Sequence, residues 1–173
     1  RIDEHLKKGE PYKVVANIPY YITGAILEKF LEHGPQPKKI VLLVQKEVAD
    51  RIVARDNKES ILSISVKSFG TPSIIAKVPP GAFTPPPTVD SAILKIENIS
   101  DTQFKENNIE ISRFFEMVRA GFAHKRKFLK RNLEAVVSRE KIATVWSTLV
   151  LDDKARAEDV TPQTWVRIAK MLQ

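Results

Sequence analysis

Cysteine is absent from the 173-residue sequence, glycine occurs only six times, and no long run of apolar residues is present. Without cysteine the protein can have no disulfide, no thiolate nucleophile and no cysteine-ligated zinc or iron–sulfur centre. Every apolar stretch is shorter than the roughly 18 residues that a transmembrane helix needs, so we expect no membrane partner. The lack of cysteine also suits a reducing compartment, and we predict a cytoplasmic protein.

Acidic residues are in the minority, with 21 aspartates and glutamates against 28 lysines and arginines and a net charge of +7. A basic chain favours a polyanionic partner, most simply a nucleic acid. The apolar fraction of 43% and the charged fraction of 28% are ordinary for a globular protein. The length allows one large domain or two small ones.

The first hundred residues alternate between strand and helix patterns. Strands are predicted at 12–18, 39–45, 72–78 and 89–97, and helices at 22–33, 46–55 and, with mixed character, 60–69. Five prolines within residues 79–88 exclude regular structure there, because proline lacks a backbone donor and fixes φ. This alternation indicates an α/β layer.

The rest of the chain has helical patterns only. After a polar linker at 98–110, helices are predicted at 111–122, 126–137, 139–149 and 161–172. Thr161 is the expected N-cap of the last helix, with Pro162 at its first position. The prediction is therefore an α/β domain at residues 1–99 followed by a small all-α domain at residues 100–173.

Asn17, Ile18, Pro19 and Tyr20 follow directly after the first predicted strand. Ligands of open α/β sheets bind at the carboxyl ends of the strands. The Asn17 amide and the carbonyl of Ile18 could accept both hydrogens of a planar exocyclic amine, while Tyr20 lies against the attached ring. The competing interpretation is a tight turn in which Asn17 bonds the local backbone and Pro19 begins the next helix.

Phe83 is the one aromatic residue in the proline-rich loop at 79–88. Prolines reduce the entropy that the loop loses on ordering, so the ring could be held as a preorganised plate. Opposite Tyr20 it would sandwich a flipped-out base, at about 1–3 kcal/mol per stacking contact. Alternatively, Phe83 is a core residue beneath the crossover loop.

Basic residues cluster between residues 113 and 141, where nine lysines and arginines face three glutamates. Apolar residues at helical spacing form the expected core of this segment. We expect the other face to bind RNA phosphates through Lys125, Arg126, Lys127, Lys130 and Arg131. A solvated helix face is the alternative. No metal is predicted, because His5, His33 and His124 have neither metal-ligand spacing nor carboxylate partners.

Five segments, in this order, resemble KsgA-type rRNA adenine dimethyltransferases: VVANIPYYIT, LLVQKEVADRIVA, VPPGAFTPPPTVDSAIL, FFEMVRAGFAHKRKFLKRNL and RAEDVTPQTW. The resemblance runs from about residue 12 to residue 172. It implies the later half of a Rossmann-like methyltransferase sheet followed by a helical rRNA-docking domain.

The resemblance also implies a reaction and its residues. Enzymes of this kind add two methyl groups to N6 of two adjacent adenosines near the 3′ end of small-subunit rRNA, using S-adenosylmethionine. The family motif N-[LI]-P-Y falls on residues 17–20 as the target-amine site, with Asn17 also beside the cofactor. The motif F-x-P-x-P-x-V-x-S begins at Phe83 and ends at Ser91, with Phe83 as the second stacking face. The implied partner is the small-subunit rRNA or its ribosomal particle.

Two departures from the family pattern stand out. Ser60-Ile61 replaces a Tyr-Gly pair, and the glycine-rich turn that approaches S-adenosylmethionine is missing from the sequence. With Arg1 as the first residue, we expect the later part of a longer protein, inactive by itself. The complete protein is expected to be a monomer, whereas the exposed edge of the first strand favours dimers or aggregates of this chain.

Other function classes compete with this interpretation. An Erm-type enzyme would methylate an adenine of large-subunit rRNA. A non-catalytic rRNA-binding or ribosome-assembly factor would need the basic cluster but not Asn17. A DNA adenine N6-methyltransferase would share the pocket and prefer duplex DNA.

Overall fold

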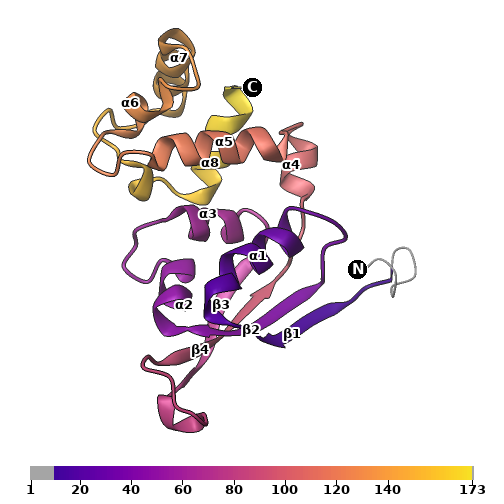
Figure 1. The fold of residues 1–173 in the computed structure, drawn as a ribbon. Helices are drawn as coiled ribbons and strands as arrows, with labels where there is room; N and C mark the ends of the chain where they lie inside the picture. Colours follow the sequence, from indigo (N-terminus) through magenta and orange to yellow (C-terminus); the bar gives the residue numbers. More distant parts are fainter. Residues whose placement is uncertain (1–9, 173) are drawn as a thin grey trace. The chain divides into compact units, whose positions relative to one another are not determined.

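The computed structural model describes residues 10–172, which divide into two compact units (Figure 1). The first unit contains the described residues up to Val53 together with Phe69–Ser100. The second contains Ala54–Ser68 and the residues from Asp101 onward. None of the helices in the described part of the chain is both long and apolar enough to cross a membrane.

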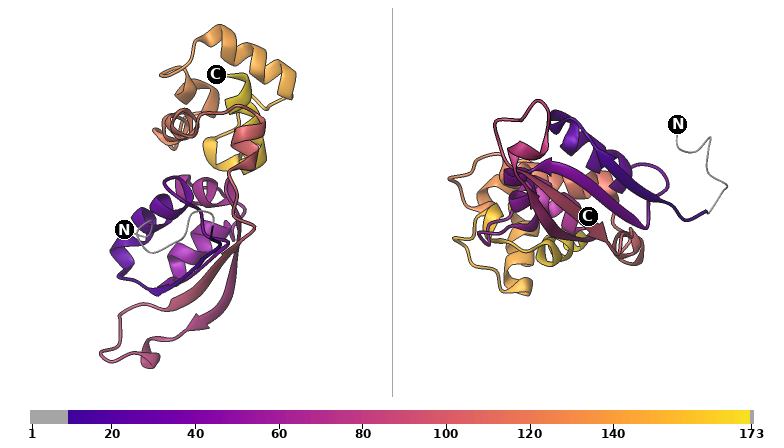
Figure 2. Two further views of the ribbon diagram at one scale, coloured as in Figure 1. Left: turned by 90° about the vertical axis from the view of Figure 1, so that its right-hand side faces the viewer. Right: turned by 90° about the horizontal axis from the view of Figure 1, so that it is seen from below.

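The first unit is built on a four-stranded sheet in the order β1-β2-β4-β3. The strands are β1 (Lys13–Asn17), β2 (Lys39–Gln45), β3 (Thr71–Val78) and β4 (Ser91–Glu97). Strands β1 and β2 are parallel, and β4 is antiparallel to β2 and to β3. As a result β1, β2 and β3 all end at the edge of the sheet where β4 begins, and the loop between β3 and β4 projects beyond that edge (Figure 2).

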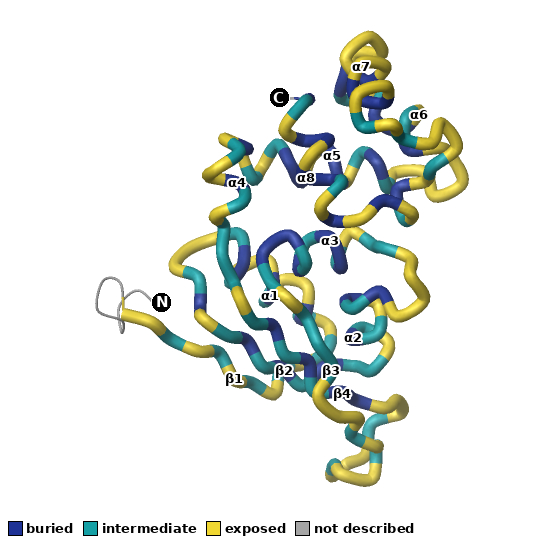
Figure 3. The backbone as a smooth tube through the Cα atoms, turned by 180° about the vertical axis from the view of Figure 1, so that it is seen from behind, coloured by how far each residue is buried: buried dark blue, intermediate teal, exposed yellow. Residues whose placement is uncertain are grey.

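Side-chain alternation explains which face of the sheet is buried. Ile40, Leu42 and Val44 of β2 are fully buried, and so are the alternate residues Ala92, Leu94 and Ile96 of β4. Helix α1 (Thr23–Leu31) and helix α2 (Lys46–Val53) contribute further buried side chains to this unit. In contrast, β1 is an outermost strand of the sheet, and its residues are exposed or half-buried (Figure 3). Val15 of this strand is 76% exposed. Self-association through the open side of β1 stays a prediction.

The second unit is helical. Its helices are α3 (Ile61–Lys67), α4 (Thr102–Glu106), α5 (Ile111–Phe122), α6 (Leu129–Leu133), α7 (Arg139–Leu149) and α8 (Pro162–Met171). The Thr161 hydroxyl accepts a hydrogen bond from the backbone of Thr164 and caps α8, as predicted. Segment 54–68 joins these helices because the backbone N–H of Glu59 donates to the carbonyl of Glu158 at 2.8 Å.

Two sequence predictions are wrong in this unit. Residues 98–110 are not only a linker, because α4 forms there and buries Phe104 edge-to-face against Phe114, with ring centroids 5.1 Å apart. The helix predicted at 126–137 is reduced to α6, and residues 123–128 form a loop. The chain is held at the start of α6 by the backbone N–H of Leu129, which donates to the carbonyl of Ala155 at 2.8 Å.

Gly121 allows the closest packing in the helical core. A Cβ at this position would lie 2.4 Å from Cη2 of Trp165 and 2.7 Å from Cδ1 of Leu129. The neighbouring Phe122 stacks on the same indole, with ring centroids 6.1 Å apart. Glycine is therefore required at this point of α5 by space rather than by backbone conformation.

Gly121→Ala should lower the free energy of unfolding of the second unit by about 1–3 kcal/mol, because the added methyl group overpacks a filled core. Tryptophan fluorescence during urea unfolding reports this unit, since both tryptophans lie in it. The control is Gly24→Ala in α1, where a Cβ meets nothing within 4 Å. Gly24→Ala should leave the urea midpoint of the tryptophan transition unchanged. An equal loss of stability in both variants would contradict this account.

The Glu97 carboxylate accepts hydrogen bonds from two lysine ammonium groups. Glu97 ends β4 and therefore lies at the opposite end of this strand from Ser91. Lys39 Nζ lies 2.6 Å from Oε1 of Glu97, and Lys95 Nζ lies 2.6 Å from Oε2. Hydrogen bonds from Lys39 and Lys95 lower the pKa of the Glu97 carboxyl from its ordinary 4.5 to about 2. The carboxylate therefore links β2 to β4 through its charged form.

A lowered folded-state pKa stabilises the protein above pH 4.5, and this contribution is lost as the pH falls toward 2. The difference in unfolding free energy between the wild type and Glu97→Gln should therefore shrink over this range. Carboxyl-carbon NMR should show Glu97 titrating near pH 2. A midpoint near 4.5 would contradict the assignment.

Candidate functional site

Residues 17–20 form the turn between strand β1 and helix α1. Asn17 ends β1 and is exposed, and Pro19 has an extended conformation (φ −56°, ψ 134°) before the short 3₁₀ helix η2 (Tyr20–Ile22). The carbonyl of Pro19 accepts a hydrogen bond from the backbone N–H of Ile22 at 3.2 Å. The side-chain amide of Asn17 has no hydrogen-bond partner among the described residues. This argues against the interpretation in which Asn17 bonds the backbone of the local turn.

A single hydrogen bond joins the two motifs that the sequence analysis singled out. The Tyr20 hydroxyl lies 2.5 Å from the Ser91 hydroxyl, although the two residues are 71 positions apart. Ser91 is fully buried at the start of β4, where it is paired with Gln45 of β2 and Val78 of β3. The phenol ring of Tyr20 is thereby fixed at the edge of the sheet where β1 also ends.

The loop between β3 and β4 carries Phe83 at this same edge. It contains the 3₁₀ helix η3 (Pro80–Ala82), and the backbone N–H of Phe83 donates to the carbonyl of Pro80 at 3.1 Å. Phe83 is half-buried and therefore not a core residue beneath the loop. The returning end of the loop is tied to α2, because the backbone N–H of Lys46 donates to the carbonyl of Asp90 at 2.9 Å.

Residues 123–128, which we call the basic loop, connect α5 to α6. A hollow on the surface is lined by Ala123, His124, Lys125, Arg126 and Lys127. The side chains of residues 125–127 are exposed and form no ion pair within the described part of the chain. The five predicted phosphate-binding residues thus separate into two groups, because the other two have carboxylate partners.

Lys130 and Arg131 of α6 are the two with partners. Lys130 Nζ lies 2.8 Å from the carboxylate of Asp153, and Arg131 lies 3.1 Å from that of Glu134. RNA would have to compete with these carboxylates for both cations. Residues 125–127 would face no such competition from a carboxylate of the described residues.

The whole chain, residues 1–173, matches the family model for ribosomal RNA adenine dimethylase. The chain belongs to this family. A small-subunit rRNA methyltransferase A of Dehalococcoides mccartyi is 42% identical over 168 residues, covering 96% of this chain and 57% of the relative. That of Trichormus variabilis is 41% identical over 173 residues, covering 96% and 63%. The chain thus spans about three fifths of these relatives.

Solved structures confirm the predicted fold class of this adenine dimethylase family member. A dimethyladenosine transferase from Plasmodium falciparum has a TM-score of 0.79 at 24% identity, with 92% of this chain and 67% of that chain covered. The 23S rRNA methyltransferase ErmE has a TM-score of 0.68 at 24% identity, with 95% and 66% covered. At such identities the likeness shows the fold alone.

Ser60-Ile61, which departs from the family pattern, begins helix α3 through a capping box. The Ser60 hydroxyl accepts from the backbone of Ser63 at 3.1 Å, and the Ser63 hydroxyl accepts from the backbone of Ser60 at 2.7 Å. Glu59 then accepts from Ser63 and, at 2.7 Å, from Lys67. In this chain the segment therefore has a local structural role, which serine, a preferred N-cap residue, could have indicated at position 60.

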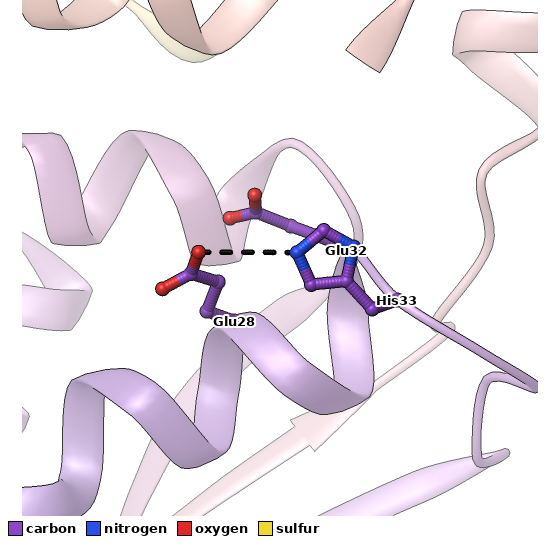
Figure 4. A group of neighbouring side chains, drawn as sticks. All are labelled: Glu28, Glu32 and His33. Atoms are coloured by element: carbon purple, nitrogen blue, oxygen red, sulfur yellow. Dashed lines mark ion pairs between the residues drawn. The ribbon is translucent and has the colours of Figure 1, made fainter. Parts of the chain in front are cut away.

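The statement that His33 has no carboxylate partner is wrong. Its Nε2 lies 3.9 Å from Oε1 of Glu28, and Glu32 lies beside the pair at the end of α1 (Figure 4). The one-turn spacing of Glu28 and Glu32 on a helix could have revealed this cluster. His33 and Glu28 are both more than half exposed, and we assign no ion to them. His124 lies in the basic loop, and His5 lies outside the described residues.

Asn132 is a residue that sequence reasoning missed. Its side chain is buried in α6 and donates hydrogen bonds to the carbonyl of Gly121, at the end of α5, and to that of His124, within the basic loop. A lone polar residue between apolar helix positions was the only signal, and it does not specify a partner.

Tyr20→Phe should lower the free energy of unfolding of the first unit by about 0.5–1.5 kcal/mol, because it leaves the buried Ser91 hydroxyl without its partner. Urea unfolding followed by circular dichroism measures this change. Tyr21→Phe is a matched control, since Tyr21 is 89% exposed, and should change stability by less than about 0.5 kcal/mol. A Tyr20→Phe variant as stable as the control would exclude a stabilising bond.

Proposed function

We propose that this chain carries the target-base site and the rRNA-docking unit of an rRNA adenine N6,N6-dimethyltransferase that acts on two adjacent adenosines near the 3′ end of small-subunit rRNA. The observation that supports this most directly is the Tyr20–Ser91 hydrogen bond, because it joins the two family motifs at one edge of the sheet. The relatives described above are small-subunit rRNA methyltransferases, which favours this rRNA over that of the large subunit.

In this proposal, residues 17–20 bind the adenine through its exocyclic amine. The Asn17 side-chain carbonyl and the Ile18 backbone carbonyl each accept one amine hydrogen. The amine is a poor nucleophile because its lone pair is delocalised into the ring. Drawing both hydrogens toward acceptors favours a pyramidal nitrogen whose lone pair points outward, so orientation and dipoles carry the catalysis rather than a general base.

Tyr20 and Phe83 hold the faces of the same base. Tyr20 is fixed through Ser91, and Phe83 is presented by the loop that leaves β3 at the same edge. Stacking of a base on an aromatic ring contributes about 1–3 kcal/mol per contact. These contacts would offset the unstacking of the adenosine from its RNA neighbours.

S-adenosylmethionine is the methyl donor in this proposal, and Asn17 is the residue that we place beside it. The residues present do not form a complete site for it. No two of the six glycines lie within two positions of each other, so the chain contains no glycine-rich turn, and Asn17 is exposed. This chain is therefore expected to bind and orient the adenine without methylating it.

A second candidate is a non-catalytic rRNA-binding or assembly factor. Two features favour it: residues 125–127 form no ion pair within residues 10–172, and the sequence lacks the glycine-rich turn. This function needs the basic loop but makes no use of the adenine amine.

The two candidates differ in how the chain responds to that amine. A fluorescent hairpin from the 3′ end of small-subunit rRNA should bind about three- to tenfold more tightly than the same hairpin with purine, which lacks the amine, at the target positions. Asn17→Ala should reduce this preference, because only the Ile18 carbonyl then accepts an amine hydrogen. If the wild-type chain binds the adenine and purine hairpins equally well, the base site is rejected and the non-catalytic rRNA-binding factor is the function that remains. Tighter binding to a large-subunit hairpin or to duplex DNA would reject the small-subunit assignment.

Replacing Lys125, Arg126 and Lys127 by glutamine should make RNA binding less salt-dependent, reducing the slope of log K against log salt by about 2 to 3. Fluorescence anisotropy at several salt concentrations measures this slope. Replacing Lys130 and Arg131 instead should have a smaller effect per charge, because both already have carboxylate partners. Equal effects per charge would show that the free and paired cations bind alike.

A further inference from the structure

Asn132 connects both sides of the basic loop through one side chain. It is 4% exposed, and its Nδ2 donates to the carbonyl of Gly121 at 2.6 Å and to that of His124 at 3.1 Å. Its Oδ1 is buried and has no hydrogen-bond partner among the described residues. The amide is therefore used entirely as a donor of two hydrogen bonds.

The two carbonyls that it binds are those that shape the loop. Gly121 lies in the last turn of α5, where backbone carbonyls lack partners within the helix. The carbonyl of His124 also accepts from the backbone N–H of Lys127 at 3.0 Å. That bond closes a turn with Lys125 and Arg126 at its corners, and Asn132 holds the base of the turn against the end of α5.

The position of Asn132 is itself fixed by its neighbours. Leu129 and Leu133 on either side of it in α6 are fully buried, and the backbone of Leu129 is bound to the carbonyl of Ala155. A substitution at residue 132 would therefore release the loop while the rest of α6 stays anchored.

We propose that Asn132 is the positioning residue of the RNA-binding surface, holding the basic loop in the shape in which Lys125, Arg126 and Lys127 meet RNA phosphates. This inference rests on the proposed rRNA-docking function. The physical reason is preorganisation, because a loop that is already ordered loses less entropy when it binds. Asn132 itself makes no contact with RNA and acts through the loop.

A double-mutant cycle on the full 173-residue chain separates this role from a general effect on folding. Asn132→Ala should weaken binding of the fluorescent small-subunit rRNA hairpin about three- to tenfold and leave the salt slope unchanged, because the charges remain. In a background with residues 125–127 replaced by glutamine, the same change should weaken binding less than about twofold. The control is Asn107→Ala, which removes an amide that donates to the carbonyl of Gln103 at 2.7 Å.

The outcomes distinguish the inference from the proposed function. If replacing residues 125–127 does not weaken binding, the docking function fails. If that replacement weakens binding but Asn132→Ala does not, or weakens it equally in both backgrounds, the positioning role is rejected. Should Asn132→Ala not fold, NMR hydrogen exchange of the wild type decides. The Asn132 side-chain amide protons should exchange more slowly than those of the half-buried Asn107, and equal rates would overturn the proposal.

Discussion

The insertion of antiparallel strand β4 between β2 and β3 determines where the residues of the proposed base site lie. Because Ser91 is paired with both Gln45 and Val78, the start of β4 coincides with the ends of two other strands. The hydrogen bond from Ser91 to Tyr20 then brings the end of β1 to the same edge. In this register, the strands that precede the Asn17 and Phe83 segments both end where β4 begins.

The helical unit depends on a comparable constraint, the close approach of α5, α6 and Trp165 around Gly121. Because Gly121 has no side chain, the indole of Trp165 can pack against it, and its carbonyl accepts a hydrogen bond from the side-chain amide of Asn132. Packing and loop shape are therefore coupled at one position. Breaking the two hydrogen bonds of this buried amide would cost free energy. This explains how an exposed loop of like charges can have a defined shape.

The two units hold different parts of the proposed chemistry. The sheet supplies carbonyl acceptors and aromatic faces for one uncharged base, where hydrogen-bond direction gives selectivity. The basic loop supplies charge for the phosphate backbone, which gives affinity and orientation but carries no sequence information. Membership in the adenine dimethylase family is consistent with this division, and the chain spans only about three fifths of its relatives.

Local pattern predicted much of the fold because the physical causes were local. The strand at 39–45 and the helices at 111–122 and 139–149 have their predicted bounds, since apolar periodicity and caps specify them. The helix at 126–137 failed because long-range bonds to Ala155 and Gly121 outweigh the helical preference of its residues. The same reasoning explains α4, whose burial of Phe104 depends on Phe114.

The order and types of the residues alone identified the family, the motif residues and the excess of positive charge. The folded chain showed that Tyr20 bonds to Ser91, that Lys130 pairs with Asp153 while residues 125–127 have no carboxylate partner within residues 10–172, and that Asn132 bonds to the carbonyls of Gly121 and His124. These bonds join residues between 8 and 71 positions apart, and a linear pattern does not specify which side chains meet across such a distance.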